Sequence, residues 1–466
     1  MAAVATVALG GIASASAVNS TPIAAYSIAA PHSVAASGLV ARAVVPAGAT
    51  CPNLVVDGRA FATRARLAGP TTGAAFAPIM ACERVMPLGA ASASFGGLTI
   101  PAAMPTRVRT LAMFGDSGCR IKGKTVQNCS NPATWPLARI ARRISATKPD
   151  VIAFIGDFFY RESACPATLQ AECGGSPPPL VGMPFTDSAY GWMADVLMPM
   201  APVLRTAPIV AVRGNHEACV RGGNGFFLLM DPRPDTADIC APTQAANGAL
   251  VAATPNPTAP YAIDLPISST RTTRLVVTDS ADGDDSAVTS TAALLRPRYA
   301  QAAALAAPRT GRESWLMTHR PLFGLRALDP TDEGSQWESA DQQAGSFGQL
   351  GNYRMIVGSH IHLAEAVQIP GQPGQLVLGN GGSDLYPSPT AIPAYGPLAS
   401  PNGTPLDSSL TPYPTATRLW AQAKFGYAVA KPGNGSGQWA LTMRDDAGRA
   451  FATCTLSGRA LTCRDA

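Results

Sequence analysis

Residues 151–160 read VIAFIGDFFY, a run of five apolar residues followed by glycine, aspartate and, three residues later, tyrosine. A short apolar run of this kind is typical of a strand that is buried on both faces, as in a parallel sheet. Residues 107–118, RVRTLAMFGDSG, contain the same arrangement, an apolar run that ends in Gly-Asp. The two stretches predict two similar strands with a carboxylate at the end of each.

Further apolar runs along the chain also end in residues that can bind a metal ion. Segments with helical spacing lie between the runs, at 134–147, 188–206 and 291–307. Strands that alternate with amphipathic helices predict βαβ units, in which ligands bind beyond the carboxyl ends of the strands. The residues at these ends are Asp116, Asp157, Asn215, His319 and the pair His360 and His362.

These side chains have the chemistry of a two-metal hydrolytic site, which needs a bridging carboxylate, neutral nitrogens and further oxygens. Taken alone, His360 and His362 could be a surface pair. Together with the carboxylates and the amide at the other strand ends, they predict a metal site. Asp279 also ends an apolar run, but it belongs to no such motif, and we expect it to be structural.

Five short motifs carry these residues in a fixed order: GDSG at 115–118, GDFFY at 156–160, GNHE at 214–217, LMTH at 316–319 and SHIH at 359–362. Their order and rough spacing, over residues 106–385, resemble those of the metallophosphoesterase superfamily, the calcineurin-like phosphoesterases. The resemblance is closest to the purple acid phosphatase branch. Two residues depart from that branch, Leu316 in place of valine and Ser359 in place of glycine.

The resemblance implies an α/β fold, a four-layer αββα sandwich, with a small N-terminal β-rich unit added to it. We expect a signal peptide at 1–17, an Ala/Ser-rich linker at 18–48 and a small β-rich domain at 49–105. Residues 106–466 would form the catalytic domain, with antiparallel closing strands near the C-terminus.

The resemblance also implies two divalent or trivalent metal ions, Fe(III) together with Fe, Zn or Mn. Metal one would take Asp116, Tyr160, His362 and Asp157, and metal two would take Asn215, His319, His360 and the same Asp157. A phenolate from Tyr160 is a hard anionic donor that favours Fe(III). The alternative for Tyr160 is an aromatic side chain that packs at the rim of the core.

In the family that the motifs resemble, the histidine at the position of His216 contacts the phosphoryl group, so His216 is the candidate catalytic residue. The alternative is a histidine held by a hydrogen bond in its turn. Other members have a further histidine after the fourth motif, which this chain lacks, because its remaining histidine is His32. Arg161 and Arg320 are candidate substrate-binding cations, and a surface salt bridge is the alternative for each.

Residues 379–382, GNGG, follow another apolar run, and they either border the site or form a plain turn. Residues 1–17 are uncharged and end in small residues, as in a secretory signal, although no Lys or Arg precedes the apolar run. The ten cysteines are an even number, and the simplest hypothesis pairs them in sequence order. These features predict a secreted or periplasmic protein.

The net charge of +5 is too small on 466 residues to indicate a dedicated nucleic-acid binder. No later stretch suggests a stable membrane anchor, and the oligomeric state is left open. The predicted function is an exported, dinuclear-metal phosphoric monoester hydrolase, in which a metal-activated hydroxide attacks the phosphorus of a small phosphate ester. The alternatives are a phosphodiesterase of the same fold and a metal-bound, non-catalytic binding protein.

Overall fold

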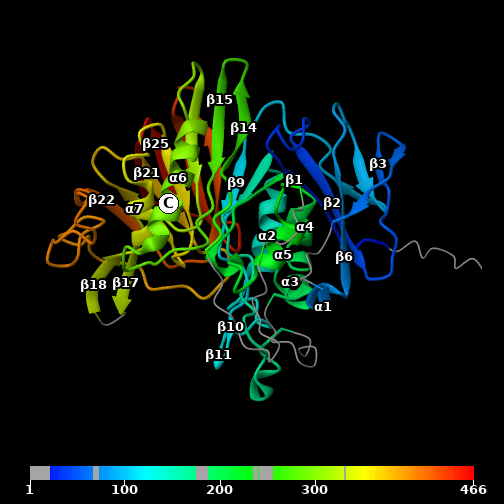
Figure 1. Ribbon diagram of the computed structural model, residues 1–466, viewed down its shortest axis with the longest axis horizontal. Helices are drawn as coiled ribbons and strands as arrows, with labels where there is room; N and C mark the ends of the chain where they lie inside the picture. Colours follow the sequence, from blue (N-terminus) through cyan, green and yellow to red (C-terminus); the bar gives the residue numbers. More distant parts are fainter. Residues whose placement is uncertain (1–20, 67–72, 175–186, 235–239, 241–254, 330–331) are drawn as a thin grey trace, which may run out of the picture.

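Two large β-sheets lie face to face in the computed structural model, with helices on both outer faces (Figure 1). The structure describes residues 21–66, 73–174, 187–234, 240, 255–329 and 332–466. The arrangement is the four-layer α/β sandwich that the sequence predicts.

The first sheet has eleven strands in the described part of the chain, and three adjacent ones carry the first three motifs. These strands, β9 (Leu111–Phe114), β12 (Val151–Phe154) and β13 (Ile209–Ala211), run parallel, so their carboxyl ends meet at one edge. The spatial order is β26 (Ala460–Asp465), β25 (Ala450–Ser457), β24 (Gln438–Asp445), β23 (Gly426–Pro432), β9 (Leu111–Phe114), β12 (Val151–Phe154), β13 (Ile209–Ala211), β1 (Ala24–Ala29), β2 (Leu39–Pro46), β6 (Ile79–Val85) and β5 (Arg64–Ala65).

The second sheet has seven strands, and its parallel strands β16 and β19 end at the last two motifs. The parallel part continues through β15 on one side and β21 on the other. The spatial order is β14 (Tyr261–Ser268), β15 (Arg271–Val277), β16 (Arg312–Met317), β19 (Met355–Gly358), β21 (Gly374–Leu378), β20 (Ala364–Gln368) and β22 (Arg418–Gln422).

Three apolar cores join the four layers. Alternation along β9 shows how: Leu111 and Met113 face the core between the two sheets, while Ala112 and Phe114 face the helices. Both faces of such a strand are buried, which explains its unbroken apolar sequence. The helices on the first sheet are α2 (Leu137–Ala146), α3 (Ala189–Trp192), α4 (Ala201–Leu204) and α5 (Gly223–Leu229), and those on the second are α6 (Ser290–Leu305) and α7 (Ala340–Ser346).

Short elements complete the described structure. A π-helical segment follows α3, and small hairpins lie outside the two large sheets. These elements are α1 (Gly73–Phe76), η1 (Ala167–Leu169), η2 (Met193–Leu197), η3 (Asn215–Glu217), β10 (Ile121–Lys122), β11 (Thr125–Val126), β17 (Leu325–Asp329) and β18 (Asp332–Trp337).

The prediction of a linker at 18–48 is wrong. Strand β1 is completely buried, runs parallel to β13 and pairs antiparallel with β2, so these residues extend the first sheet. Low charge in this region reflects burial on both faces rather than a free chain. The predicted signal peptide at 1–17 lies outside the described residues.

The predicted β-rich unit at 49–105 does not form a separate sheet along its whole length. Strands β5 and β6 join the first sheet beside β2. The other strands form a four-stranded sheet in the order β4 (Arg59–Phe61), β3 (Leu54–Val56), β7 (Ala93–Phe95) and β8 (Leu98–Ile100).

All ten cysteines form disulfides, and the pairing in sequence order is confirmed. The five disulfide bonds are Cys51–Cys82, Cys119–Cys129, Cys165–Cys173, Cys219–Cys240 and Cys454–Cys463.

No helix in the described part of the chain is long and apolar enough to cross a membrane.

Candidate metal centre

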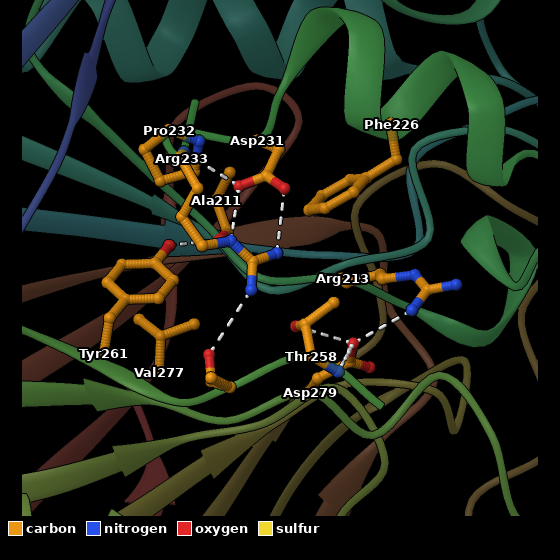
Figure 2. A pocket seen from close by; sticks show the side chains of 11 residues that line it. Ala211, Arg213, Phe226, Asp231, Pro232, Arg233, Thr258, Tyr261, Val277 and Asp279 are labelled. Carbon is orange, nitrogen blue, oxygen red and sulfur yellow. Dashed lines mark hydrogen bonds and ion pairs between the residues drawn. The ribbon is translucent and has the colours of Figure 1, made fainter. Parts of the chain in front are cut away.

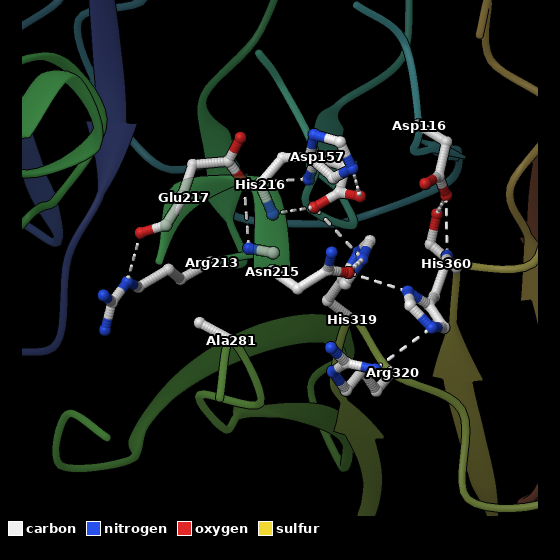
Figure 3. Close-up of polar contacts among 12 residues, drawn as sticks. Asp116, Asp157, Arg213, Asn215, His216, Glu217, Ala281, His319, Arg320 and His360 are labelled. Atoms are coloured by element: carbon white, nitrogen blue, oxygen red, sulfur yellow. Dashed lines mark hydrogen bonds and ion pairs between the residues drawn. The ribbon is translucent and has the colours of Figure 1, made fainter. Parts of the chain in front are cut away.

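The motif residues meet where the strands of both sheets end (Figure 3). Asp116, Asp157 and His360 have φ angles of 53°, 55° and 72°. This left-handed conformation costs a non-glycine residue about 1–3 kcal/mol, so the surrounding contacts must hold it. One such contact joins the backbone N–H of His360 to Oδ2 of Asp116 at 2.7 Å. The tight turns direct these side chains toward one another at the rim.

The hydroxyl of Tyr160 is the meeting point of the first group of donors. It lies 2.6 Å from Oδ1 of Asp116, 2.8 Å from Oδ2 of Asp157 and 2.9 Å from Nε2 of His362. Burial, followed by the charges of Asp116 and Asp157, raises the pKa of Tyr160 well above its usual value. A hydroxyl has one proton and can donate it to only one of three neighbours. Two carboxylates, a phenol and an imidazole in one place fit a first-row metal cation.

Asn215 is the meeting point of the second group. Its Oδ1 lies 2.9 Å from Nε2 of His319 and 2.7 Å from Nδ1 of His360. Nε2 of His319 is also 3.2 Å from Oδ1 of Asp157. Asp157 therefore presents one carboxylate oxygen to each group, as a bridging ligand must. The structure brings together all seven residues that the sequence predicts as metal ligands.

Backbone carbonyls orient two of the histidine rings. Nδ1 of His319 lies 2.8 Å from the carbonyl of Ile155, and Nδ1 of His362 lies 2.6 Å from that of Asp384. Because a carbonyl only accepts hydrogen bonds, each Nδ1 carries a proton, and Nε2 is the nitrogen that could offer its lone pair to a metal ion.

Glu217 joins the third motif to the second. Burial, followed by the charge of Asp157, raises the pKa of the Glu217 carboxyl to about 8. The sequence analysis assigned Glu217 no role, although an acid directly after Asn-His was the available signal. The two carboxyl oxygens accept hydrogen bonds from the backbone N–H groups of Asp157 at 2.9 Å, Phe158 at 2.8 Å, Phe159 at 3.1 Å and Gly214 at 2.9 Å.

His216 lies beside both groups. Its ring is 3.9 Å from that of Tyr160, and its Nε2 is 3.8 Å from Oδ2 of Asp157. On the far side, Nδ1 lies 2.7 Å from Oε1 of Glu162. Burial lowers the pKa of His216. Glu162, two residues after the GDFFY motif, is a functional candidate that the sequence analysis missed.

The pKa of Glu162 is lowered to about 2. Burial alone would raise the pKa. The contact with His216 and the positive charges of Arg221 and Lys122 lower it, and together they outweigh burial. Arg221 Nη1 is 3.9 Å from Oε1 of Glu162, and Lys122 Nζ is 3.6 Å from Oε2. Glu162 is therefore an anion that faces the Nδ1 edge of His216 at neutral pH.

The family model described as calcineurin-like phosphoesterase matches residues 111–364, more than half of the chain. The chain belongs to the calcineurin-like phosphoesterases. It is a metal-dependent phosphoester hydrolase by family, and its substrates are small phosphate esters. No curated protein sequence matches it.

Two solved structures share the fold of this phosphoesterase. A purple acid phosphatase, PPD1, from yellow lupin (Lupinus luteus) seeds has 12% identity and a TM-score of 0.56, over 94% of this chain and 74% of its own. PhoD has 11% identity and a TM-score of 0.53, over 95% of this chain and 92% of its own. At such identities the likeness establishes the fold alone.

The geometry of the phosphoesterase contradicts the predicted substrate role of Arg161. The side chain is fully buried, and its guanidinium lies 2.7 Å from Oδ1 of Asp195 and 2.7 Å from the carbonyl of Cys173. Neighbouring residues of an extended segment point in opposite directions, so Tyr160, which faces the centre, directs Arg161 away from it. Arg161 instead anchors the segment that carries the tyrosine.

Two other arginines lie at the phosphoesterase centre. Arg320 contacts Asp285, and its Nη1 is 3.2 Å from Nε2 of His360. Arg120, which the sequence analysis did not select, lies with its guanidinium carbon 5.4 Å from the centre of the Tyr160 ring. Arg120 directly follows Cys119, so the short disulfide loop holds it beside the first donor group.

The 379–382 loop of the phosphoesterase borders the centre, which decides between the two alternatives. The backbone N–H of Gly381 donates to the carbonyl of Gly115 at 2.9 Å, and that of Ser383 donates to the carbonyl of Asp116 at 2.9 Å. A Cβ at position 379 would collide with the carbonyl of Ile361, so the close approach requires glycine there.

A small cavity lies next to Arg213, the residue before the third motif (Figure 2). Arg213, directly before the GNHE motif, donates to Oδ2 of Asp279 at 2.9 Å and to the carbonyl of Glu217 at 2.9 Å. The cavity has room for about one water molecule. Asp279 thus has the structural role that the sequence predicts.

Proposed function

We propose that this protein is an exported, dinuclear-metal phosphoric monoester hydrolase of the purple acid phosphatase branch. The supporting observation is the position of Asp157, whose two carboxylate oxygens face two separate groups of donors. Asp116, Tyr160 and His362 complete one group, and Asn215, His319 and His360 complete the other. When bound, the two ions would supply Lewis-acid polarisation of the phosphoryl group and a nucleophile derived from water.

The imidazolium form of His216 acts as the proton donor to the leaving oxygen through Nε2, the ring atom directed to the centre. The anionic carboxylate of Glu162 lies 2.7 Å from Nδ1 and stabilises this charged form. Ring stacking on Tyr160 limits rotation of the imidazole. A fixed acid beside the reacting group contributes about 10²–10⁴ to the rate in other enzymes. A binding protein without turnover would not need this pair, which favours catalysis.

Monoester preference rests on the two arginines. A monoester dianion offers more negative charge than a diester, and Arg120 and Arg320 lie beside opposite donor groups. Arg120→Ala would raise the KM for p-nitrophenyl phosphate about tenfold, the value of one lost charge-assisted hydrogen bond. A larger effect of the same substitution on bis-p-nitrophenyl phosphate would favour the phosphodiesterase alternative. Arg418→Ala, an exposed arginine on β22, is the control.

Metal dependence and catalysis are tested together. The full chain loaded with Fe, Zn or Mn is assayed with p-nitrophenyl phosphate and compared with Asp157→Asn and His216→Ala. Loss of turnover in both variants supports the proposal, whereas full activity of Asp157→Asn would contradict it. Asp407→Asn, at an exposed carboxylate that contacts Ser409, controls for loss of one charge. Metal retained without turnover in the unsubstituted protein would favour a binding protein.

Export is supported by the five disulfides, because such bonds persist in oxidising compartments. We expect a secreted or periplasmic protein whose mature N-terminus follows Ala15 or Ala17. N-terminal sequencing of protein recovered from the medium or periplasm tests this, and recovery only from the cytoplasm would contradict it.

A further inference from the structure

His360 is oriented differently from the other two histidines of the centre. His319 and His362 turn Nε2 inward and bind a backbone carbonyl through Nδ1. His360 turns Nδ1 inward, 2.7 Å from Oδ1 of Asn215. Its Nε2 points outward and lies 3.2 Å from Oδ1 of Asp285. A carboxylate therefore stands where a backbone carbonyl stands for the other rings.

Asp285 is held at this position by Arg320. The two form an ion pair, and the Arg320 side chain is 9% exposed. Nη1 of Arg320 also lies 3.2 Å from Nε2 of His360. Arginine only donates hydrogen bonds and an ionised carboxylate only accepts them. Oδ1 of Asp285 can therefore receive both N–H groups, which places the two donors next to each other.

The same contacts allow one other arrangement of the protons. If Arg320 donated to Nε2 of His360, then the ring proton would be on Nδ1, and Nδ1 could not bind a metal ion. Asp285 favours the first arrangement because its carboxylate only accepts hydrogen bonds, so it can take the Nε2 proton of His360 as well as a proton from Nη1 of Arg320. We propose that Asp285 is a positioning residue that keeps Nδ1 of His360 free for the second metal position.

A third metal ion is the rival interpretation of these side chains. Oxygens of Asp285 and Glu338 lie within 4.8 Å of a nitrogen of His360 and of each other. However, Arg320 is paired with Asp285, and Nε of Arg326 is 2.6 Å from Oε1 of Glu338. Two guanidinium groups already compensate both carboxylates, which disfavours a further cation.

The inference rests on the proposed dinuclear site, and its test separates the two. The Zn(II)-loaded full chain, labelled with ¹⁵N-histidine, is examined by long-range ¹H–¹⁵N correlation of its five imidazole rings. Comparison with His360→Asn assigns the His360 signals. We expect the His360 proton on Nε2, and the protons of His319 and His362 on Nδ1. A His360 proton on Nδ1 would overturn the inference.

Asp285→Ala is expected to weaken Zn(II) binding at one of two positions about 10-fold to 100-fold, as measured by competition with a chelator. The same variant should change the ring signals of His360 and leave those of His362 unchanged. Asp285→Asn, whose Oδ1 still accepts a proton from Nε2, should restore the wild-type ring signals. Asp284→Asn is the matched control, because in the described structure the carboxylate of Asp284 accepts hydrogen bonds from Ser286 and Ala287 and none from His360 or Arg320.

The outcomes are distinct. Fewer than two Zn(II) ions per wild-type chain would contradict the proposed function. The role of Asp285 alone would be overturned if wild type binds two Zn(II) ions and Asp285→Ala has the same Zn(II) affinity and the same His360 ring signals as wild type. A third tightly bound ion that is lost in Asp285→Ala would also overturn it, in favour of the rival interpretation.

Discussion

Oε1 of Glu162 lies 2.7 Å from Nδ1 of His216, on the side of the ring that faces away from the metal ligands. The two residues come from different motif segments and meet only because β12 and β13 are neighbours in the first sheet. We expect this contact to keep the Nδ1 edge of His216 turned away from the centre, and it can be tested apart from the proposed ligands.

Glu162→Gln is expected to lower kcat about 10-fold to 100-fold, because the charge that holds the Nδ1 proton is lost while the shape is kept. Since Glu162 acts through His216, adding His216→Ala should cause little further loss beyond His216→Ala alone. Steady-state kinetics with p-nitrophenyl phosphate measure both effects. Multiplicative losses in the double variant would show that the two residues act independently. Lys122→Ala, which removes an exposed neighbour of Glu162, is the control.

Tyr160→Phe is expected to abolish the visible charge-transfer band of the iron-loaded protein, since only the phenol oxygen can bind Fe(III). The ring and its contact with His216 should remain, so the midpoint of thermal unfolding of the metal-free chain should change little. An absorption spectrum of protein with a measured iron content checks the prediction. A colourless wild-type protein with iron bound would contradict ligation by the tyrosine.

Glu217→Gln is expected to lower the free energy of unfolding by about 2–4 kcal/mol. The glutamine has only one acceptor oxygen, and its amide group would face backbone N–H donors of the GDFFY turn. Urea denaturation of metal-free protein measures the change. The half-buried Glu172 provides the matched Glu→Gln control, and an equal effect of both substitutions would refute the role of Glu217.

Asp187 is expected to make folding less favourable as the pH rises. Burial raises the pKa of its carboxyl from 3.8 to about 6. The folded state therefore binds this proton more tightly than the unfolded state, and the associated stability is present below about pH 4 and lost as the pH passes 6. Asp187→Asn lacks this dependence. The stability of the variant relative to wild type should improve by about 2 kcal/mol between pH 4 and pH 7, as measured by urea denaturation. An unchanged difference over that range would contradict the shifted pKa.

The sequence was most informative where a residue and its structural setting lie close together in the chain. The predicted metal ligands lie in the short segments that follow apolar strands, so the strand pattern places them at the rim, while Tyr160 and the division into two ligand sets came from the resemblance to the family. The disulfides close short loops, so pairing in sequence order was the simplest hypothesis and is correct. The sequence was misleading at 18–48, because small uncharged residues suit a buried strand as well as a free linker.

Residues whose role depends on a distant partner could not be found in this way. Glu162 and Asp285 contact histidines that follow other strands, and no local pattern marks them. Arg161 is the opposite case. Its position next to Tyr160 suggested that it binds the substrate, whereas the fold pairs it with Asp195. The sequence by itself therefore predicted which residues meet at the centre, the order of the strands along the chain and the disulfide framework. Only the tertiary structure decided which side chains orient those ligands, because strand order in space, unlike strand order in the chain, sets which distant residues touch.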